Sequence, residues 1–236
     1  MNKLPEKRDN APPASRAHDI QAVVFDLDGL MFNTEEIYQE VGRTLLGRRG
    51  KTFEPDLMDK MMGRPPRIAL QLMIDHHQLE IDVDALAAES NETFMELLDG
   101  RIAPMPGLVN LLDALETAKL PKSIATSSSR RFVEHVLQRF DYQPRFEFVL
   151  SSDDVTNGKP HPEVYLTAAA RFGIAPEQML VLEDSENGCR AAAASGAVAV
   201  AVPHGASLRH DVSMAAMVID SLADPALYAR LGIDSE

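Results

Sequence analysis

The sequence predicts an α/β protein in which a doubly wound parallel sheet carries an inserted helical block. Three observations support this prediction. Short, continuously apolar segments recur along the chain, as is typical of parallel strands that are covered on both faces. Helical stretches separate the later segments, and a strand-free helical stretch lies between the first two. Together these features indicate a Rossmann-like core with an inserted α-helical cap domain.

The predicted strands are rich in Val, Ile and Ala and are too short for helices. They cover residues 21–25, 122–126, 146–150, 178–182 and 197–202, with a weaker sixth at 216–219. Two stretches between them have apolar residues at helical spacing, at 130–140 and 161–172. Gly173 stands where the second of these helices would end.

Residues 35–103 show helical periodicity and no convincing strand, so we predict that they form the cap domain. The core domain then comprises residues 20–34 and 104–236, and "RIAPMPG" is the returning linker. Residues 1–19 contain several prolines and scattered charges but no apolar run of a signal peptide. We expect them to be a disordered tail.

Composition excludes several functional classes. The chain has 236 residues, of which 45% are hydrophobic, and a formal net charge of −13. Such a charge disfavours non-specific contact with nucleic acid or an anionic membrane, and no segment is long and apolar enough to cross a bilayer. Cys189 is the only cysteine, which excludes an intrachain disulfide and favours a cytoplasmic setting. We expect a monomer or a weak homodimer.

Polar residues follow the predicted strands at the points where those strands end. The first strand is followed by Asp26 and Asp28, the second by a Thr-Ser-Ser-Ser run, and the fourth by Glu183 and Asp184. Ligands of open α/β sheets bind beyond these strand ends. Converging carboxylates, hydroxyls and the nearby Lys159 suit phosphoryl transfer with Mg²⁺, which offsets the charge of buried acids. Each acid alone could instead cap a helix or a turn.

Four segments carry a resemblance to a known family. "FDLDGLMFNTE", "IATSSSR", "GKPHPEVY" and "VLEDSENG" resemble, in order and spacing, the signature motifs of the haloacid dehalogenase superfamily. The resemblance covers roughly residues 20–225. The chain is most similar to the cap-bearing sugar-phosphate and nucleotide phosphatases, a group that includes β-phosphoglucomutase and pseudouridine-5′-phosphatase.

The resemblance implies a role for each matching residue. Asp26 would be the nucleophile that forms an aspartyl-phosphate, and Asp28 the general acid and base. Ser127 would hydrogen-bond the transferring phosphoryl group and Lys159 would clamp it. Ser128 would contact the phosphate or merely cap the next helix, and Thr126 would be a structural strand residue. The implied cofactor is Mg²⁺, and its implied ligands are Asp26, Asp28, Asp184 and Glu183, the last directly or through a water.

The cap would select a small phosphorylated metabolite. Its candidate substrate residues are Glu35, Tyr38, Arg64 and Arg67. In β-phosphoglucomutase an arginine matching Arg67 holds a second phosphate, although a solvated arginine is an equally good interpretation. Tyr38 stands where that mutase has a histidine, which weakens the mutase interpretation. Asn33 replaces the usual aspartate before the threonine, with little expected effect because both residues can cap a helix.

The favoured function is therefore a Mg²⁺-dependent phosphatase that hydrolyses a small organic phosphomonoester, a sugar phosphate or a nucleotide. The alternative enzyme is a hexose-phosphate mutase of the β-phosphoglucomutase kind. A catalytically silent binding protein is disfavoured by the intact set of motif residues. The remaining candidates are given structural roles: His76 and His77 as surface or partly packed residues, Cys189 as core packing, and Asp153 and Asp154 as loop residues or metal neighbours.

Overall fold

The computed structural model describes residues 20–61 and 66–234, apart from the side chains of residues 59, 99 and 206. The predicted disordered tail over residues 1–19 and the candidate Arg64 lie outside the described residues.

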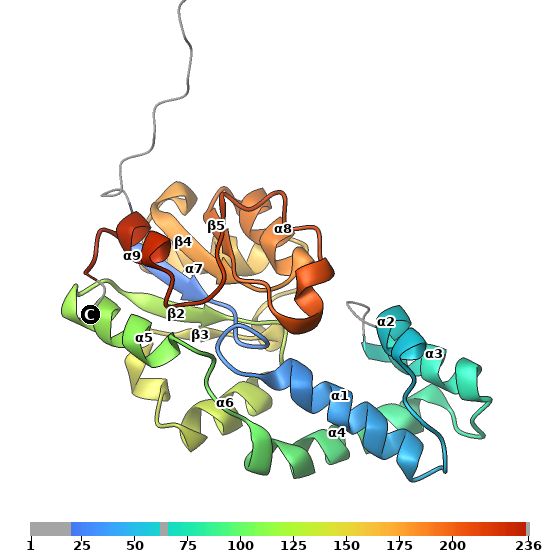
Figure 1. Cartoon of the computed structure of the whole chain (residues 1–236). Helices are drawn as coiled ribbons and strands as arrows, with labels where there is room; N and C mark the ends of the chain where they lie inside the picture. The colour runs from blue at the N-terminus through green and yellow to red at the C-terminus, as the bar shows by residue number, and fades with distance from the viewer. Residues whose placement is uncertain (1–19, 62–65, 235–236) are drawn as a thin grey trace, which may run out of the picture.

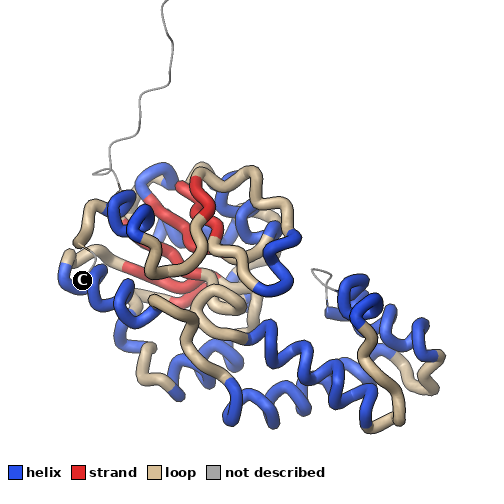
Figure 2. The backbone as a smooth tube through the Cα atoms, viewed as in Figure 1, coloured by secondary structure: helices blue, strands red, loops and turns tan. Residues whose placement is uncertain are grey.

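A six-stranded parallel sheet forms the centre of the molecule (Figures 1 and 2). The strand order is β3-β2-β1-β4-β5-β6, which places β1 between β2 and β4. All the predicted strands are confirmed, most of them slightly shorter than predicted. Their bounds are β1 Ala22–Phe25, β2 Lys122–Ala125, β3 Val149–Leu150, β4 Met179–Glu183, β5 Val198–Ala201 and β6 Met217–Val218.

The third strand is shorter than predicted because its first residues pair only in part. The short helix η2 (Gln143–Arg145) leads directly into this segment. Glu147 still donates its amide to the Lys122 carbonyl at 2.9 Å, and Ile124 donates to the Phe148 carbonyl at 3.2 Å. The regular ladder with β2 begins only at Val149.

Helices cover both faces of the sheet, as the near-continuous apolarity of the strands predicts. Val23 and Phe25 of β1 face the layer formed by α5, α6 and α9. Val24 faces the opposite layer, formed by α7 and α8. The bounds of these helices are α5 Leu108–Thr117, α6 Arg130–Arg139, α7 Glu163–Phe172, α8 Glu186–Ser195 and α9 Pro225–Leu231. The predicted helices and the doubly wound core are therefore confirmed.

Helices α1–α4, which we call the helical insertion, lie between β1 and α5 in the chain and extend to one side of the sheet (Figure 1). Helix α1 packs along α4, and α2, α3 and α4 contact one another in turn. Within the described residues, no helix combines the length and the apolarity needed to cross a membrane. The bounds are α1 Thr34–Gly47, α2 Pro55–Met61, α3 Pro66–His77 and α4 Val83–Arg101.

The two connections between the sheet and the helical insertion lie against each other. The Asn33 amide nitrogen donates to the Ala103 carbonyl at 3.2 Å, and the Ala103 amide donates to Asn33 Oδ1 at 2.7 Å. Asn33 Nδ2 donates to the Arg101 carbonyl at 3.2 Å and to Glu36 at 3.1 Å. The expected capping role of the Asn33 side chain is wrong, because this side chain makes no cap bond to α1. It binds the returning linker instead.

Candidate active site

The two acids after β1 are fixed by the centre of the sheet. Asp26 continues the ladder beyond β1, since its amide donates to the Leu182 carbonyl of β4 at 3.0 Å. Only 6% of Asp26 is exposed. Because the strand order reverses direction around β1, this end of the sheet is the crevice where ligands of such folds bind.

A glycine lets a third acid approach this strand end. Gly29 has φ +78°, a left-handed conformation that residues with a side chain rarely adopt. A Cβ at this position would lie 2.5 Å from Asp184 Oδ2. Gly29 is therefore needed both for the turn after Asp28 and for the close approach of Asp184.

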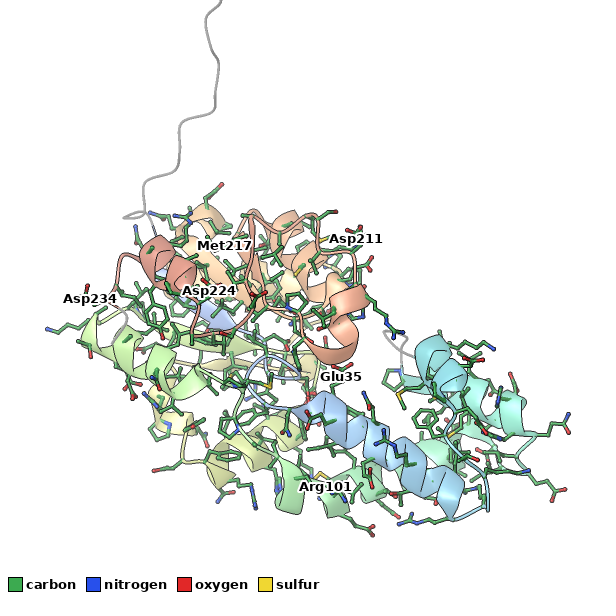
Figure 3. The ribbon with its side chains drawn as sticks, in the orientation of Figure 1. Glu35, Arg101, Asp211, Met217, Asp224 and Asp234 are labelled. Carbon is green, nitrogen blue, oxygen red and sulfur yellow. The ribbon has the colours of Figure 1, made fainter. Side chains whose placement is uncertain are left out.

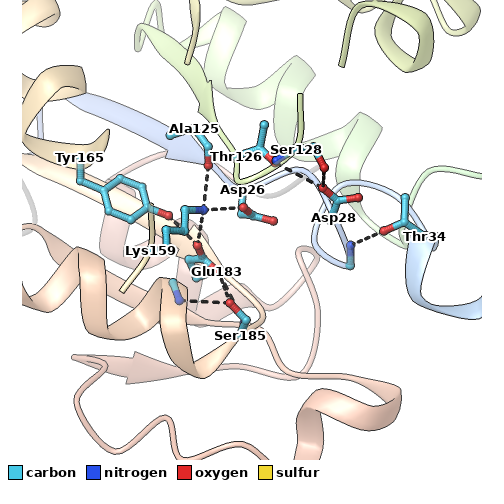
Figure 4. Close-up of polar contacts among 12 residues, drawn as sticks. Asp26, Asp28, Thr34, Ala125, Thr126, Ser128, Lys159, Tyr165, Glu183 and Ser185 are labelled. Carbon is cyan, nitrogen blue, oxygen red and sulfur yellow. Dashed lines mark hydrogen bonds and ion pairs between the residues drawn. The ribbon is translucent and has the colours of Figure 1, made fainter. Parts of the chain in front are cut away.

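Lys159 lies at the centre of the site and is almost fully buried (Figure 4). Its Nζ contacts Asp26 Oδ1 at 2.5 Å, Glu183 Oε1 at 2.6 Å and the Ala125 carbonyl at 2.9 Å. These three acceptors match the three donors of an ammonium group. Lys159 thus links the Asp26 carboxylate to the end of β2 and to Glu183 at the end of β4.

Glu183, which is completely buried, accepts hydrogen bonds at both carboxylate oxygens. In addition to Lys159, Tyr165 donates its hydroxyl to Oε1 at 2.6 Å, and Ser185 donates to Oε2 at 3.0 Å. Gly188 on α8 makes room for this carboxylate, because a Cβ there would lie 1.8 Å from Glu183 Cδ. The position of Glu183 is thereby determined by packing as well as by hydrogen bonds.

Two hydroxyls bind one oxygen of Asp28, and the hydroxyl of Thr34 also lies close enough to lower the pKa of this carboxyl. Ser128 donates its hydroxyl to Asp28 Oδ2 at 2.5 Å, and Thr126 donates to the same oxygen at 3.3 Å. The other oxygen, Oδ1, is buried and has no hydrogen-bond partner among the described residues. Buried carboxylate oxygens normally have partners, so this free oxygen indicates a place for a ligand or a transferred proton.

Burial controls the charge of the site. Burial, with smaller contributions from the charges of Glu183 and Asp28, raises the pKa of Asp26 to about 8 despite the opposing charge of Lys159. Burial also raises the pKa of Asp28 and, together with the charges of Asp26 and Glu183, raises that of Asp184 well above its usual range. Burial opposes the charge on Lys159, but Asp26 and Glu183 outweigh it and raise the pKa of that ammonium group. The carboxylates therefore exceed the available positive charge, and the site favours a further cation.

The arrangement of acids fits a divalent metal. Asp26, Glu183 and Asp184 each offer an oxygen, and these atoms lie within 4.8 Å of one another. An all-oxygen set suits Mg²⁺, which uses one or two carboxylates and keeps several waters. The close approach of Asp184 at Gly29 agrees with this fit, whereas Asp28, which the resemblance implies as a further ligand, lies outside this set of three oxygens.

The hydroxyls that follow β2 lie in different surroundings. Ser127 is exposed, and it lines a cavity of about 120 Å³ with Thr126 and Lys159 rather than contacting Asp28. Thr126 is buried and faces Asp28, so it is more than a structural strand residue. Asp154 is bound to Ser151 and Arg130, which gives it a loop role.

Two contributors were missed by the sequence reasoning. Tyr165 lies in the stretch that the apolar spacing predicts as a helix, and Ser185 stands in the quoted segment "VLEDSENG" without an assigned role; both donate to Glu183. For Tyr165 the signal in the sequence is a hydroxyl on an otherwise apolar helix face, and for Ser185 it is a position directly after the acids that follow β4.

The candidate substrate residues fall into two groups. Glu35 lies at the start of α1 beside η5 (Gly205–Arg209), and its charge contributes to the raised pKa of Asp184 (Figure 3). Tyr38 is half-exposed and packs on Phe94 with ring centroids 4.3 Å apart. Burial of its hydroxyl end and the charge of Asp28 raise the pKa of Tyr38, so both residues lie near the site. Arg67 instead forms an ion pair with Asp84 within the helical insertion and lines a separate hollow of about 300 Å³.

The fold and the strand-end acids define a hydrolase with a Rossmann-like core. Residues 23–202 match the family described as "Haloacid dehalogenase-like hydrolase", and the chain belongs to this family.

Its relatives include named phosphatases. The chain is 35% identical over 209 residues to a Drosophila melanogaster protein named "Probable pseudouridine-5′-phosphatase", covering 85% of this chain and 89% of the relative. It is 31% identical over 182 residues to the fructose-1-phosphate phosphatase of Escherichia coli, covering 76% and 95%. A Deinococcus radiodurans HAD family hydrolase solved with bound phosphate and sodium is 27% identical and superposes with a TM-score of 0.77, over 92% of this chain and 99% of that chain.

Proposed function

We propose that the protein is a Mg²⁺-dependent phosphatase that hydrolyses a small organic phosphomonoester, a sugar phosphate or a nucleotide, through an aspartyl-phosphate on Asp26. One observation carries this proposal. Asp26 is held at 2.5 Å by Lys159 beside a cluster of buried acids, and Asp28, two residues later, has a buried oxygen with no hydrogen-bond partner in the part of the chain that the structure describes.

Asp26 attacks the phosphorus in line with the ester oxygen in this proposal. Lys159 orients the Asp26 carboxylate by a hydrogen bond to Oδ1, which leaves Oδ2 for the attack on the substrate. The hydroxyl of Thr126, assisted by Ser128, takes the phosphate-contacting position that the sequence suggested for Ser127. All three donors of Lys159 are used by the protein, so its contact with phosphate requires the exchange of one of these bonds.

Asp28 moves the protons. Burial raises its pKa, which favours a protonated carboxyl that can donate to the leaving oxygen. After the alcohol leaves, the same carboxylate accepts a proton from the water that hydrolyses the aspartyl-phosphate. Its free Oδ1 is the oxygen available for both transfers.

Mg²⁺ would be held by Asp26 and Asp184, with Glu183 acting on the metal or through one of its waters. When bound, it would supply positive charge for the phosphate oxygens and keep Asp26 ionised at neutral pH. Because both oxygens of Glu183 already accept hydrogen bonds, we assign its main role to the positioning of Lys159.

The helical insertion serves as the cap in this proposal. Glu35 and Tyr38, which lie near the carboxylates, are the residues that contact the leaving group. Arg67, in contrast, is bound to Asp84 and is not assigned to the substrate. The buried, unpaired Cys189 supports a cytoplasmic setting.

Phosphate release tests the proposal. The protein should release phosphate from some members of a panel of sugar phosphates and nucleoside monophosphates only when Mg²⁺ is present. Asp26→Asn should lower turnover by at least about 10³-fold while circular dichroism and the melting temperature remain close to wild type. Substantial Mg²⁺-dependent activity in this variant would exclude Asp26 as the nucleophile. Isomerisation of a hexose phosphate without phosphate release would favour the mutase instead.

A further inference from the structure

Three side chains that can bind a metal meet in the helical insertion, outside the carboxylate site. Glu54 immediately precedes α2, and His76 and His77 are the last two residues of α3. Each offers one donor atom, and the three donor atoms lie within 4.8 Å of one another. The antiparallel pairing of α2 with α3 thus brings the start of one helix to the end of the other.

The geometry directs both imidazoles toward one carboxylate oxygen. The distance from His77 Nε2 to Glu54 Oε2 is 3.3 Å, and that from His76 Nε2 to the same oxygen is 3.9 Å. The two imidazole rings lie nearly perpendicular, at 79°, with centroids 4.7 Å apart. In a tetrahedral site with bonds of about 2.0–2.1 Å, donor atoms lie roughly 3.4 Å apart, so His77 and Glu54 already have this spacing and the exposed His76 must move closer to Glu54.

Two of these atoms lack a hydrogen-bond partner. Glu54 Oε2 and His77 Nε2 are both buried, and neither makes a hydrogen bond to any residue the structure describes. The His77 side chain is only 9% exposed. Buried polar atoms without partners are rare, and each calls for a ligand that would satisfy it.

We propose that Glu54, His76 and His77 form a second metal site, which binds Zn²⁺ or a similar divalent transition metal with a water in the fourth position. Imidazole nitrogens favour such metals, whereas Mg²⁺ prefers oxygen ligands. The chain would then hold two chemically distinct metals. The second metal ties the segment before α2 to the end of α3, and it takes no part in phosphoryl transfer.

Equilibrium dialysis of the metal-free full chain against Zn²⁺, with excess Mg²⁺ present, tests this proposal. Wild type and Asp184→Asn should bind one Zn²⁺ ion equally well. His77→Ala should bind it at least about tenfold more weakly, because even the removal of a residue that only supports a metal ligand costs that much affinity. His135→Ala, a partly exposed histidine on α6, is the matched control and should bind as wild type does.

Two further readouts separate this site from a simple ion pair between His77 and Glu54. Zn²⁺ should raise the melting temperature of wild type but not that of Glu54→Gln, which removes a partly exposed carboxylate and leaves the fold intact. Co²⁺ should give visible absorption bands of a tetrahedral site, absent from Glu54→Gln. Equal Zn²⁺ binding in wild type and His77→Ala, or loss of all Zn²⁺ in Asp184→Asn, would overturn the proposal.

Discussion

Replacement of Gly188 by alanine tests whether the site depends on the packing of Glu183. The added Cβ would lie 1.8 Å from Glu183 Cδ and 1.8 Å from Oε1, far inside van der Waals contact. Glu183 is fully buried between α8 and the strand ends, so it cannot move without breaking its bonds to Lys159, Tyr165 or Ser185.

The magnitude follows from two costs. Overpacking of a dense interior costs about 1–3 kcal/mol, and loss of one hydrogen bond to a buried charged group costs about 1.5–3 kcal/mol. We therefore expect Gly188→Ala to lower the free energy of unfolding by about 2.5–6 kcal/mol. Activity should fall as well, because Lys159 loses the carboxylate that helps to orient it toward Asp26.

Urea denaturation and phosphate release measure the two effects. Gly100→Ala is the matched control, because Gly100 also lies within a helix, α4, and a Cβ there would meet nothing within 4 Å. Alanine should stabilise that helix by up to about 1 kcal/mol and leave activity unchanged. The reasoning is refuted if Gly188→Ala is as stable and as active as Gly100→Ala.

Three further substitutions test other parts of the site and the fold. In phosphate-release assays, Thr126→Val should lower kcat at least about tenfold, whereas Ser127→Ala should change it by no more than about twofold. The reverse result would mean that Ser127, and not Thr126, contacts the phosphate. Tyr165→Phe should cost about 1–3 kcal/mol in urea denaturation, because Glu183 loses a buried donor; unchanged stability would mean that this bond contributes nothing. Glu116, 44% exposed, has its pKa lowered to about 2 by Arg145 and Lys122. Its contribution to the free energy of unfolding is therefore present above the pKa of the unfolded chain, near 4.5, and is lost as the pH falls toward 2. Solvent screening reduces this contribution to about 1 kcal/mol, and Glu116→Gln should lose it at pH 6 and differ less from wild type at pH 3; an equal difference at both pH values would contradict this sign.

Much of the core could be predicted because its signals are local. Parallel strands covered on both faces are apolar along their whole length, and acids at their ends mark the ligand-binding edge without any knowledge of the tertiary structure. Asp26, Asp28, Glu183 and Asp184 were found in this way, and the structure brings Asp26, Glu183 and Asp184 together.

Contacts between distant segments could not be predicted in this way. The sequence does not show where a strand leaves the sheet, and a shift of one residue reverses the direction of a side chain. Thr126 still donates its amide to the Leu150 carbonyl, so its hydroxyl faces Asp28 and that of Ser127 does not. The bond between Lys159 and Asp26 joins residues 133 positions apart, and no local pattern specifies it.

The amide of Asn33 has a consequence for movement of the helical insertion. An aspartate at this position could accept the Ala103 amide but could not donate to the Arg101 carbonyl, and it would repel Glu36. Because the two crossing segments are bonded to each other, they form one pivot rather than two independent tethers. A rotation of the helical insertion about this bonded pair of segments would move Glu35, at the start of α1, less than it would move α2 and α3, which lie farther from the sheet (Figure 1).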